Sequence, residues 1–148
     1  MNYSIETVDK SAYENVLAVW EASVRATHDF LSEADIQYFK PLILDTYLDA
    51  VSLRCVRNRQ QHIIGFSGTA AGNLEMLFIH PDYRGQKVGK TLLDYAIKEM
   101  SVTQVDVNEQ NEQAVGFYQH NGFEVVGRSE LDGTGKPYPI LHMLLKDR

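Results

Sequence analysis

The chain has 148 residues, of which 44% are hydrophobic and 23% are charged, and its formal net charge is −6. This length predicts a single domain over residues 1–148, which can bury a full core without disulfides or a structural metal. The negative charge argues against nucleic-acid binding, which requires a basic surface. A lone cysteine, Cys55, excludes an intramolecular disulfide. Because MNYSIETVDK lacks the apolar core of a signal peptide and no apolar run is long enough to span a membrane, we expect a cytoplasmic protein that does not bind membranes.

The first half of the chain alternates between patterns typical of strands and of helices. The expected elements are a strand over residues 2–8, a helix capped by Asp9 or Ser11 and running to about Thr27, a second helical region from Ser32 to Leu48 interrupted at Pro41, and a hairpin of Val51–Arg57 and His62–Ala70. In the first helix Trp20, Val24 and His28 recur every fourth residue, which places them on one face.

The middle of the chain reads as a strand, a tight loop and a helix in immediate succession. Leu74–Ile79 is apolar on both faces except at Glu75, which predicts a central strand covered on both sides. The polar loop His80–Lys87 then brings Arg84 to the start of the next helix. A helix N-terminus attracts anions because its first N–H groups are unpaired and the helix dipole is positive there. This arrangement predicts a ligand that carries phosphate.

The second half continues with alternating helices and strands. The expected elements are a helix over Val88–Met100, a strand over Gln104–Asn108, a helix over Asn111–Asn121, and strands over Phe123–Leu131 and Pro139–Leu145. Asn111 is expected to cap its helix and Gly122 to end it. The order β-α-α-β-β-β-α-β-α-β-β predicts a mixed sheet with helices on both faces, and the strands on either side of the middle helix should be parallel.

Two motifs resemble those of the GNAT N-acetyltransferase superfamily. Arg84-Gly85-Gln86-Lys87-Val88-Gly89 is similar to its acyl-CoA loop, Arg/Gln-x-x-Gly-x-Gly/Ala, although Lys87 stands where the motif has its first glycine. NEQAVGFYQHNGF at residues 111–123 is similar to the family's N-x-x-A-x-x-F-Y-x-x-x-G-F. THDFL at 27–31 and GRSELDGTGKPYPILHM at 127–143 look like a group of small bacterial members. The resemblance implies a three-layer α/β/α fold of the α/β class, whose mixed, mostly antiparallel sheet is splayed between two parallel strands.

The resemblance also implies a reaction, in which an acetyl group moves from acetyl-CoA to a primary amine by direct attack in a ternary complex, without a metal. Tyr118 looks like the family's general acid, which protonates the departing thiolate. The residues expected to bind acetyl-CoA are Phe78, Ile79, Arg84, Gly85, Gln86, Lys87, Val88, Gly89, Lys90 and Asn111. A backbone N–H near Phe78 and Ile79 would also stabilise the oxyanion of the intermediate.

The amine acceptor must lose a proton, and three residues are candidates for the general base: Glu75 acting through a water, His28 and His142. The acceptor pocket is expected to be lined by Trp20, His28, Phe30, Tyr138 and His142, with Glu75 deeper. Aromatic walls beside a carboxylate suit an amine. The alternative is that Trp20 and His28 are ordinary core residues.

Several alternatives stay open at this point. The acceptor can be a small-molecule amine, a protein N-terminus or a lysine side chain, and the chain can act as a monomer or a homodimer. A CoA-binding sensor of the same fold without turnover is the rival to the enzyme. The five histidines have no zinc-like spacing, and no Ser/His/Asp arrangement is evident.

Overall fold

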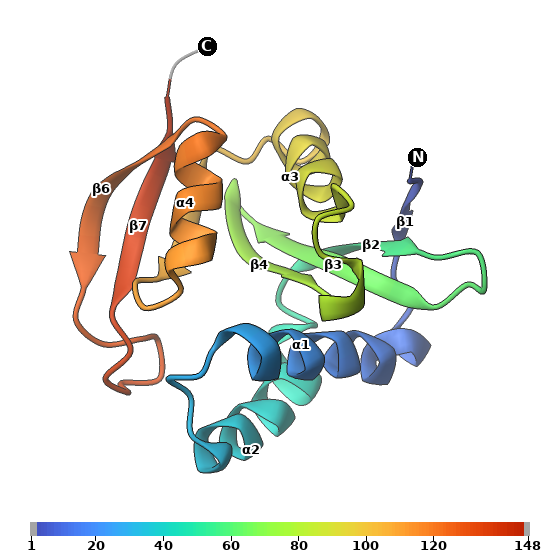
Figure 1. Cartoon of the computed structure of the whole chain (residues 1–148), viewed down its shortest axis with the longest axis horizontal. Coiled ribbons are helices and arrows are strands. Elements are labelled where there is room, and N and C mark those ends of the chain that lie inside the picture. Colours follow the sequence, from blue (N-terminus) through green and yellow to red (C-terminus); the bar gives the residue numbers. More distant parts are fainter. Residues whose placement is uncertain (1–2, 147–148) are drawn as a thin grey trace.

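The computed structural model describes residues 3–146, which form one seven-stranded sheet with helices on both faces (Figure 1). In spatial order the strands are β1 (Ile5–Thr7), β2 (Ser52–Arg57), β3 (Ile63–Ala70), β4 (Asn73–Ile79), β5 (Gln104–Asn108), β7 (Ile140–Leu145) and β6 (Phe123–Ser129). Within these residues only β4 and β5 pair in parallel. The predicted mixed, mostly antiparallel sheet is therefore confirmed.

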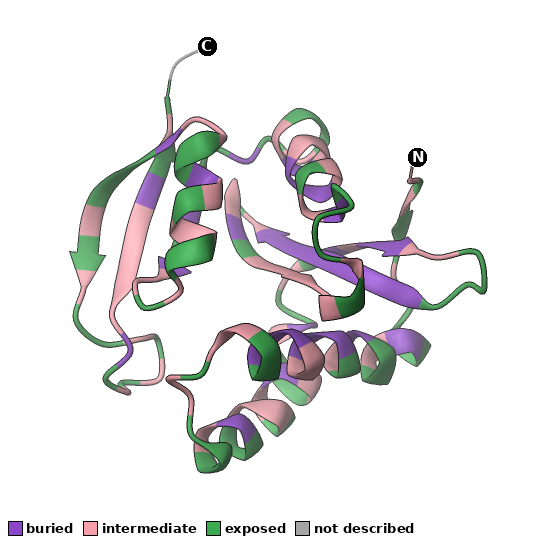
Figure 2. Ribbon diagram, in the orientation of Figure 1, coloured by how far each residue is buried: buried purple, intermediate pink, exposed green. Residues whose placement is uncertain are grey.

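The helices form two layers. They are α1 (Tyr13–Thr27), α2 (Glu33–Leu42), α3 (Val88–Glu99) and α4 (Glu112–His120), with short turns η1 (Lys10–Ala12) and η3 (Pro81–Tyr83) and a π-helical turn η2 (Ile43–Tyr47). One core joins α1, α2 and η2 to the sheet through Trp20, Leu48 and Phe66. On the opposite face α3 and α4 pack over Leu74, Val105 and Met143. Figure 2 shows β3, which both layers cover, as buried along nearly its whole length.

The sheet opens between its two parallel strands. β4 and β5 pair only at Asn73 with Gln104 and at Leu74 with Val105. Directly after this pairing β4 has a bulge. Gly68 of β3 pairs with Met76, and the next residue of β3, Thr69, pairs with Leu74, so Glu75 has no partner on β3. The bulge leaves Glu75 as the extra residue and re-aims the strand. Beyond Leu74 the edge of β4 that faces β5 has no strand partner in the described part of the chain.

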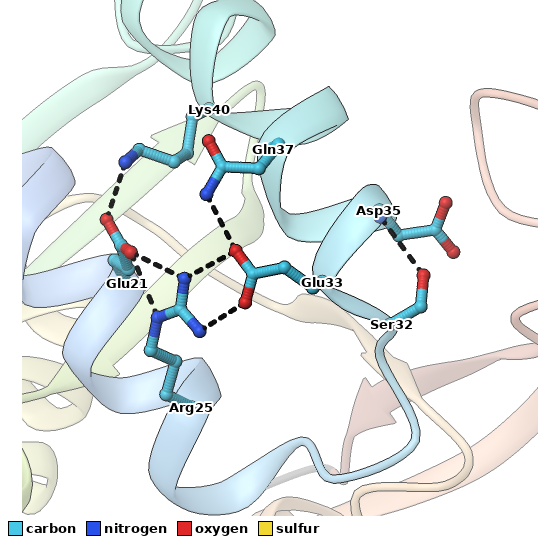
Figure 3. A network of polar contacts seen from close by, with 7 residues as sticks. All are labelled: Glu21, Arg25, Ser32, Glu33, Asp35, Gln37 and Lys40. Atoms are coloured by element: carbon cyan, nitrogen blue, oxygen red, sulfur yellow. Dashed lines mark hydrogen bonds and ion pairs between the residues drawn. The ribbon is translucent and has the colours of Figure 1, made fainter.

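A polar network fixes α2 against α1 (Figure 3). Arg25 of α1 donates two hydrogen bonds to Glu33 at 2.7 and 2.9 Å and forms an ion pair with Glu21 at 2.9 Å. Lys40 reaches back to Glu21 at 2.8 Å, and Ser32 caps α2 by accepting from the Asp35 N–H at 3.1 Å. Solvent-exposed pairs contribute little individually, so the main effect of the network is to set the angle between two helices.

The structure differs from the sequence predictions in details of the element ends. Pro41 does not interrupt the second helical region, because it lies inside α2 and the chain passes directly into the wider π turn η2. A proline lacks the N–H that an α-helix needs, and the wider turn accommodates this loss. Of the last two predicted strands, the first ends two residues earlier than expected, at Ser129, and the second starts one residue later, at Ile140. Asn2 of the expected first strand lies outside the described residues.

Candidate active site

The predicted anion-binding loop borders a cavity of about 400 Å³, which we call the loop cavity. It lies between the start of α3, the open edge of β4 and the helix α4. Its lining consists of Ser23, Thr27, His28, Leu77, Phe78, Ile79, Tyr83, Arg84, Gly85, Lys87, Val88, Gly89, Lys90, Asn111, Gln113, Ala114, Phe117 and Tyr118. Of the ten residues expected to bind acetyl-CoA, nine therefore lie together. The tenth, Gln86, points elsewhere and accepts a hydrogen bond from the Tyr3 hydroxyl at 3.1 Å.

The start of α3 has the chemistry of an anion site. None of the backbone N–H groups from Gly85 to Lys90 has a hydrogen-bond partner within residues 3–146. Lys87 is the N-cap and adopts a left-handed conformation with φ of 67°. Glycine adopts this conformation without strain, which explains the glycine of the family motif at this position. Gly89 borders the cavity, and an added Cβ would fit there in ordinary van der Waals contact, 3.7 Å from both Ile79 and Phe117.

A second cavity of about 500 Å³ lies on the other side of the opening in the sheet, beneath α1 and α2, and we call it the helix cavity. Its walls are largely apolar and aromatic, with Trp20, Phe39, Tyr47 and Tyr138 among them. Three carboxylates, those of Glu75, Asp106 and Asp132, also line it, and no lysine or arginine does within the described residues. This electrostatic environment favours a cationic ligand.

The two cavities meet at a small set of shared residues. These are His28, Leu77, Phe78, Asn111, Ala114 and Tyr118. The shared residues come from α1, from the unpaired edge of β4 and from α4. A ligand in the loop cavity can therefore contact a ligand in the helix cavity only beside these side chains.

Tyr118 is held rigidly at this junction. Its side chain is 5% exposed, and its ring packs edge-on against Phe117 and Phe123 with centroid distances of 5.3 and 5.8 Å. Within residues 3–146 no hydrogen bond to its hydroxyl is formed, and the hydroxyl is not a fully buried unpaired group, so the O–H can donate into the cavities it borders. Burial raises the pKa of Tyr118 above the usual value of 10, which keeps the phenol protonated at neutral pH.

His28 and Asn111 form a polar contact across the same junction. The side-chain oxygen of Asn111 caps α4, as predicted, by accepting a hydrogen bond from the Ala114 N–H at 3.2 Å. The side-chain nitrogen of Asn111 lies 3.4 Å from Nε2 of His28. The hydroxyl of Thr27 donates to the Ser23 carbonyl at 2.8 Å, so the Nδ1–H of His28 donates to that hydroxyl, also at 2.8 Å. Burial and the positive charge of Arg84 lower the pKa of His28 to about 4, so it is neutral at pH 7.

Tyr138 joins the loop between β6 and β7 to α2 and so closes one side of the helix cavity. Its hydroxyl donates a hydrogen bond to Asp35, and Lys136 forms an ion pair with the same carboxylate at 3.0 Å. Burial and this carboxylate raise the pKa of Tyr138 to about 12. Phe30 does not line the cavity but packs behind it, with its ring centroid 6.1 Å from that of Tyr138.

Of the other residues expected in the acceptor pocket, Trp20, His28 and Glu75 line the helix cavity, whereas His142 does not. His142 lies on β7 beside Asp106, with Nδ1 2.7 Å from the carboxylate oxygen, and its Nε2 is 2.7 Å from the Ser129 hydroxyl. The expectation that no Ser/His/Asp arrangement exists is therefore wrong. The sequence spacing of residues 106, 129 and 142 does not indicate that they are neighbours. The strand order β5-β7-β6 brings them together.

Comparisons with known proteins agree with this architecture. A family model described as an acetyltransferase (GNAT) domain matches residues 52–125. Peptidyl-lysine N-acetyltransferase YjaB of Salmonella typhimurium is 44% identical over 131 residues, covering 88% of this chain and 90% of that protein. The chain belongs to the GNAT acetyltransferase family. The solution structure of apo YjaB from Escherichia coli matches this GNAT chain with a TM-score of 0.90 and 39% identity, and the match covers 100% of both. A PaiA N-acetyltransferase from Thermoplasma acidophilum, solved in complex with coenzyme A, is 22% identical and shares the fold, with a TM-score of 0.71 over 99% of this chain and 100% of that one.

Family membership confirms the predicted recognition, the fold and the activity of an N-acetyltransferase. Three residues that line the cavities were not expected from the sequence, namely Gln113 and Phe117 in the loop cavity and Asp106 in the helix cavity. Gln113 accepts a hydrogen bond from Arg84 and follows the cap of α4 by two residues, so the helical register could have identified it. Within residues 3–146 no group of three or more histidine, cysteine or acidic side chains could hold a metal ion, and no helix is long and apolar enough to cross a membrane.

Proposed function

We propose that this GNAT enzyme transfers the acetyl group of acetyl-CoA to the ε-amino group of a lysine in a peptide or protein, with both substrates bound at once. The observation that carries the proposal is the pair of cavities that meet beside Tyr118, one with an anion site and one with carboxylates. The relatives named peptidyl-lysine N-acetyltransferases from Salmonella typhimurium and Escherichia coli support lysine as the acceptor. A cytoplasmic location and a monomeric or homodimeric state are predictions that accompany this proposal.

The loop cavity fits the donor substrate. The unpaired N–H groups from Gly85 to Lys90 are positioned to bind a diphosphate, and Arg84 and Lys87 add positive charge. The unpaired edge of β4 offers backbone groups near Phe78 and Ile79 to an amide-rich ligand arm, which would extend the sheet as an added strand. A backbone N–H on this edge also serves as the donor to the oxyanion that forms during attack.

Tyr118 acts as the general acid in this proposal. It borders both cavities, its hydroxyl is free to donate, and its raised pKa keeps the proton available. After the amine attacks the thioester carbonyl, the tetrahedral intermediate collapses and the carbon–sulfur bond breaks. The phenol then donates its proton to the departing sulfur.

Glu75 acts as the proton acceptor, directly or through a water. The bulge in β4 turns this exposed carboxylate into the helix cavity at the point where β4 leaves β5. A lysine side chain is almost entirely protonated at pH 7, so a nearby base must remove a proton before the nitrogen can attack. His28 is a weaker candidate, because both of its ring nitrogens already have polar partners, the Thr27 hydroxyl at 2.8 Å and the Asn111 side-chain amide at 3.4 Å.

The helix cavity suits an alkylammonium acceptor. Its aromatic walls can contact the methylene groups of a lysine side chain, and ring faces attract the ammonium before it is deprotonated. The three carboxylates add attraction for a cation, and no basic side chain among the described lining residues opposes it. An acidic acceptor would be disfavoured by the same groups.

A peptide assay tests the proposal. The purified protein is incubated with acetyl-CoA and either of two peptides, one with a single lysine and a blocked N-terminus, the other with a free N-terminus and no lysine. We expect acetylation of the lysine peptide, seen by mass spectrometry, and stoichiometric release of free thiol. Acetylation of the N-terminal amine alone would assign a different acceptor, and binding of acetyl-CoA without transfer to any amine would favour the sensor without turnover.

A further inference from the structure

Ser129, His142 and Asp106 form a hydrogen-bonded chain on the face of the sheet opposite α3 and α4. The hydroxyl oxygen of Ser129 is 2.7 Å from Nε2 of His142, and Nδ1 of His142 is 2.7 Å from Oδ1 of Asp106. The amide of Asn73 donates to the second oxygen of Asp106 at 3.3 Å. Both ends of the imidazole and both oxygens of the carboxylate are therefore held.

The sheet builds this chain from three neighbouring strands. His142 on β7 pairs with Asp106 on β5 and with Gly127 on β6. Gly127 follows an irregularity in β6, and a Cβ at this position would lie 3.6 Å from Cδ2 of His142. The imidazole therefore lies over Gly127, where it crosses β6 and reaches Ser129.

The polarity of the hydrogen bonds is that of an activated serine. A carboxylate only accepts, so the ring proton of His142 is on Nδ1, facing Asp106. In the neutral ring Nε2 is then an acceptor, and the Ser129 hydroxyl donates to it. This is the tautomer and orientation in which a histidine can take the proton of a serine nucleophile, and such a constellation is recognised by its geometry whatever the fold.

The reactive end of this chain, Ser129 and His142, lies outside the loop cavity and the helix cavity, whereas Asp106 also lines the helix cavity. The side chains of His142 and Asp106 are 41% and 40% exposed, and Ser129 is half-buried. A small molecule can therefore approach the group from solvent.

We propose that Ser129 is a nucleophile activated by His142 and Asp106, and that it cleaves small activated carboxylic esters. Oγ of Ser129 attacks the ester carbonyl while its proton passes to Nε2 of His142. Collapse of the tetrahedral intermediate breaks the ester C–O bond, and the leaving alcohol takes that proton. Water, deprotonated by His142, then releases the acid from the acyl-serine and restores the hydroxyl.

The test uses the full-length protein with p-nitrophenyl acetate and with a fluorophosphonate probe that labels activated serines. We expect a p-nitrophenol burst and a covalent adduct that mass spectrometry maps to Ser129. Ser129→Ala should remove the adduct, and His142→Gln should slow its formation at least tenfold, since general base catalysis typically contributes about 100- to 10,000-fold. Ser52→Ala is the matched control, because Ser52 is also on a strand but is exposed and has no histidine partner among the described residues.

The acetyl-CoA-dependent reaction and the melting temperature of Ser129→Ala should both equal those of the wild type, which separates this site from the proposed function. An adduct on other residues, or labelling of Ser129 at the same rate in His142→Gln, would overturn the proposal. If thermal melting shows that His142→Gln does not fold, Asn73→Ala is the variant that tests the proposal instead. This variant leaves His142 in place and should slow labelling only severalfold by releasing one oxygen of Asp106, and an unchanged rate would also count against the triad.

Discussion

Replacing Tyr118 with phenylalanine removes one oxygen atom at the junction of the two cavities and leaves the ring in place. General acid catalysis typically contributes about 100- to 10,000-fold. A thiolate is a good leaving group, since free thiols have a pKa of about 8.5, so we expect the lower end of that range or somewhat less. The predicted loss in kcat is about 10- to 100-fold, which corresponds to roughly 1.4–2.7 kcal/mol in the barrier.

The fold should be unaffected by this change. The ring packing against Phe117 and Phe123 is retained, and no hydrogen bond within the described residues is lost with the hydroxyl. The melting temperature and the acetyl-CoA dissociation constant should therefore match those of the wild type. Because burial raises the pKa of Tyr118, its deprotonation should produce no alkaline loss of activity between pH 6 and 9.

The assay is single-turnover acetylation of a lysine peptide, which isolates the chemical step from product release. Tyr95→Phe is the matched control, because the Tyr95 hydroxyl lies 3.5 Å from Arg54 and lines neither cavity. A single-turnover rate in Tyr118→Phe equal to that of the wild type would refute the assignment of Tyr118 as the acid.

Three further predictions concern the two cavities. Gly89→Glu places a carboxylate among the free N–H groups of α3, where a Cβ fits without a clash, so the fold should survive. The rise in melting temperature caused by CoA, about 5–10 °C at 100 times Kd, should disappear. An undiminished rise would place the diphosphate elsewhere. Glu75→Gln should lower kcat/KM for the acceptor at least tenfold at pH 7, with the defect shrinking toward pH 10 as the amine deprotonates by itself, and a defect independent of pH would exclude its role as base. The pKa of His28 falls from 6.5 to about 4 on folding, so between these pH values the unfolded chain binds a proton that the folded chain does not. The free energy of unfolding is therefore highest above pH 6.5 and decreases as the pH falls to about 4. Chemical denaturation should show that the free energy of unfolding decreases by up to about 3 kcal/mol between pH 6.5 and 4, and this decrease should be absent in His28→Gln.

The sequence was most informative where local pattern and chemistry coincide. The strand, loop and helix around Arg84 were predicted with the correct order, and nine of the ten expected acetyl-CoA residues line one cavity. Asn111 caps its helix as predicted, because the preference of asparagine for this position is a local property of the backbone. The parallel pairing of β4 and β5 was predicted from the helical crossover through α3 that connects them.

Features that depend on register between distant strands were not predictable. The bulge that turns Glu75 into the helix cavity arises from the pairing of β3 with β4; Gly68 of β3 marks its place, but a single glycine does not specify which residue of β4 is left unpaired. The contact of Asp106 with His142 requires β7 to lie between β5 and β6, which the order of elements along the chain does not specify. His142 lies outside the expected acceptor pocket because the helix cavity extends along these strands only as far as Ile140 and Asp106, and Asp106 is the residue that pairs with His142.

In the proposed reaction two substrates meet at Tyr118, and the acetyl group passes directly from one to the other. Initial velocities measured over a grid of acetyl-CoA and lysine-peptide concentrations test it most directly. Because the donor and acceptor occupy different cavities that share one junction, the double-reciprocal lines should intersect, as they do for a ternary complex. Parallel lines, together with an acetylated enzyme isolated in the absence of peptide, would show transfer through a covalent intermediate and contradict the account.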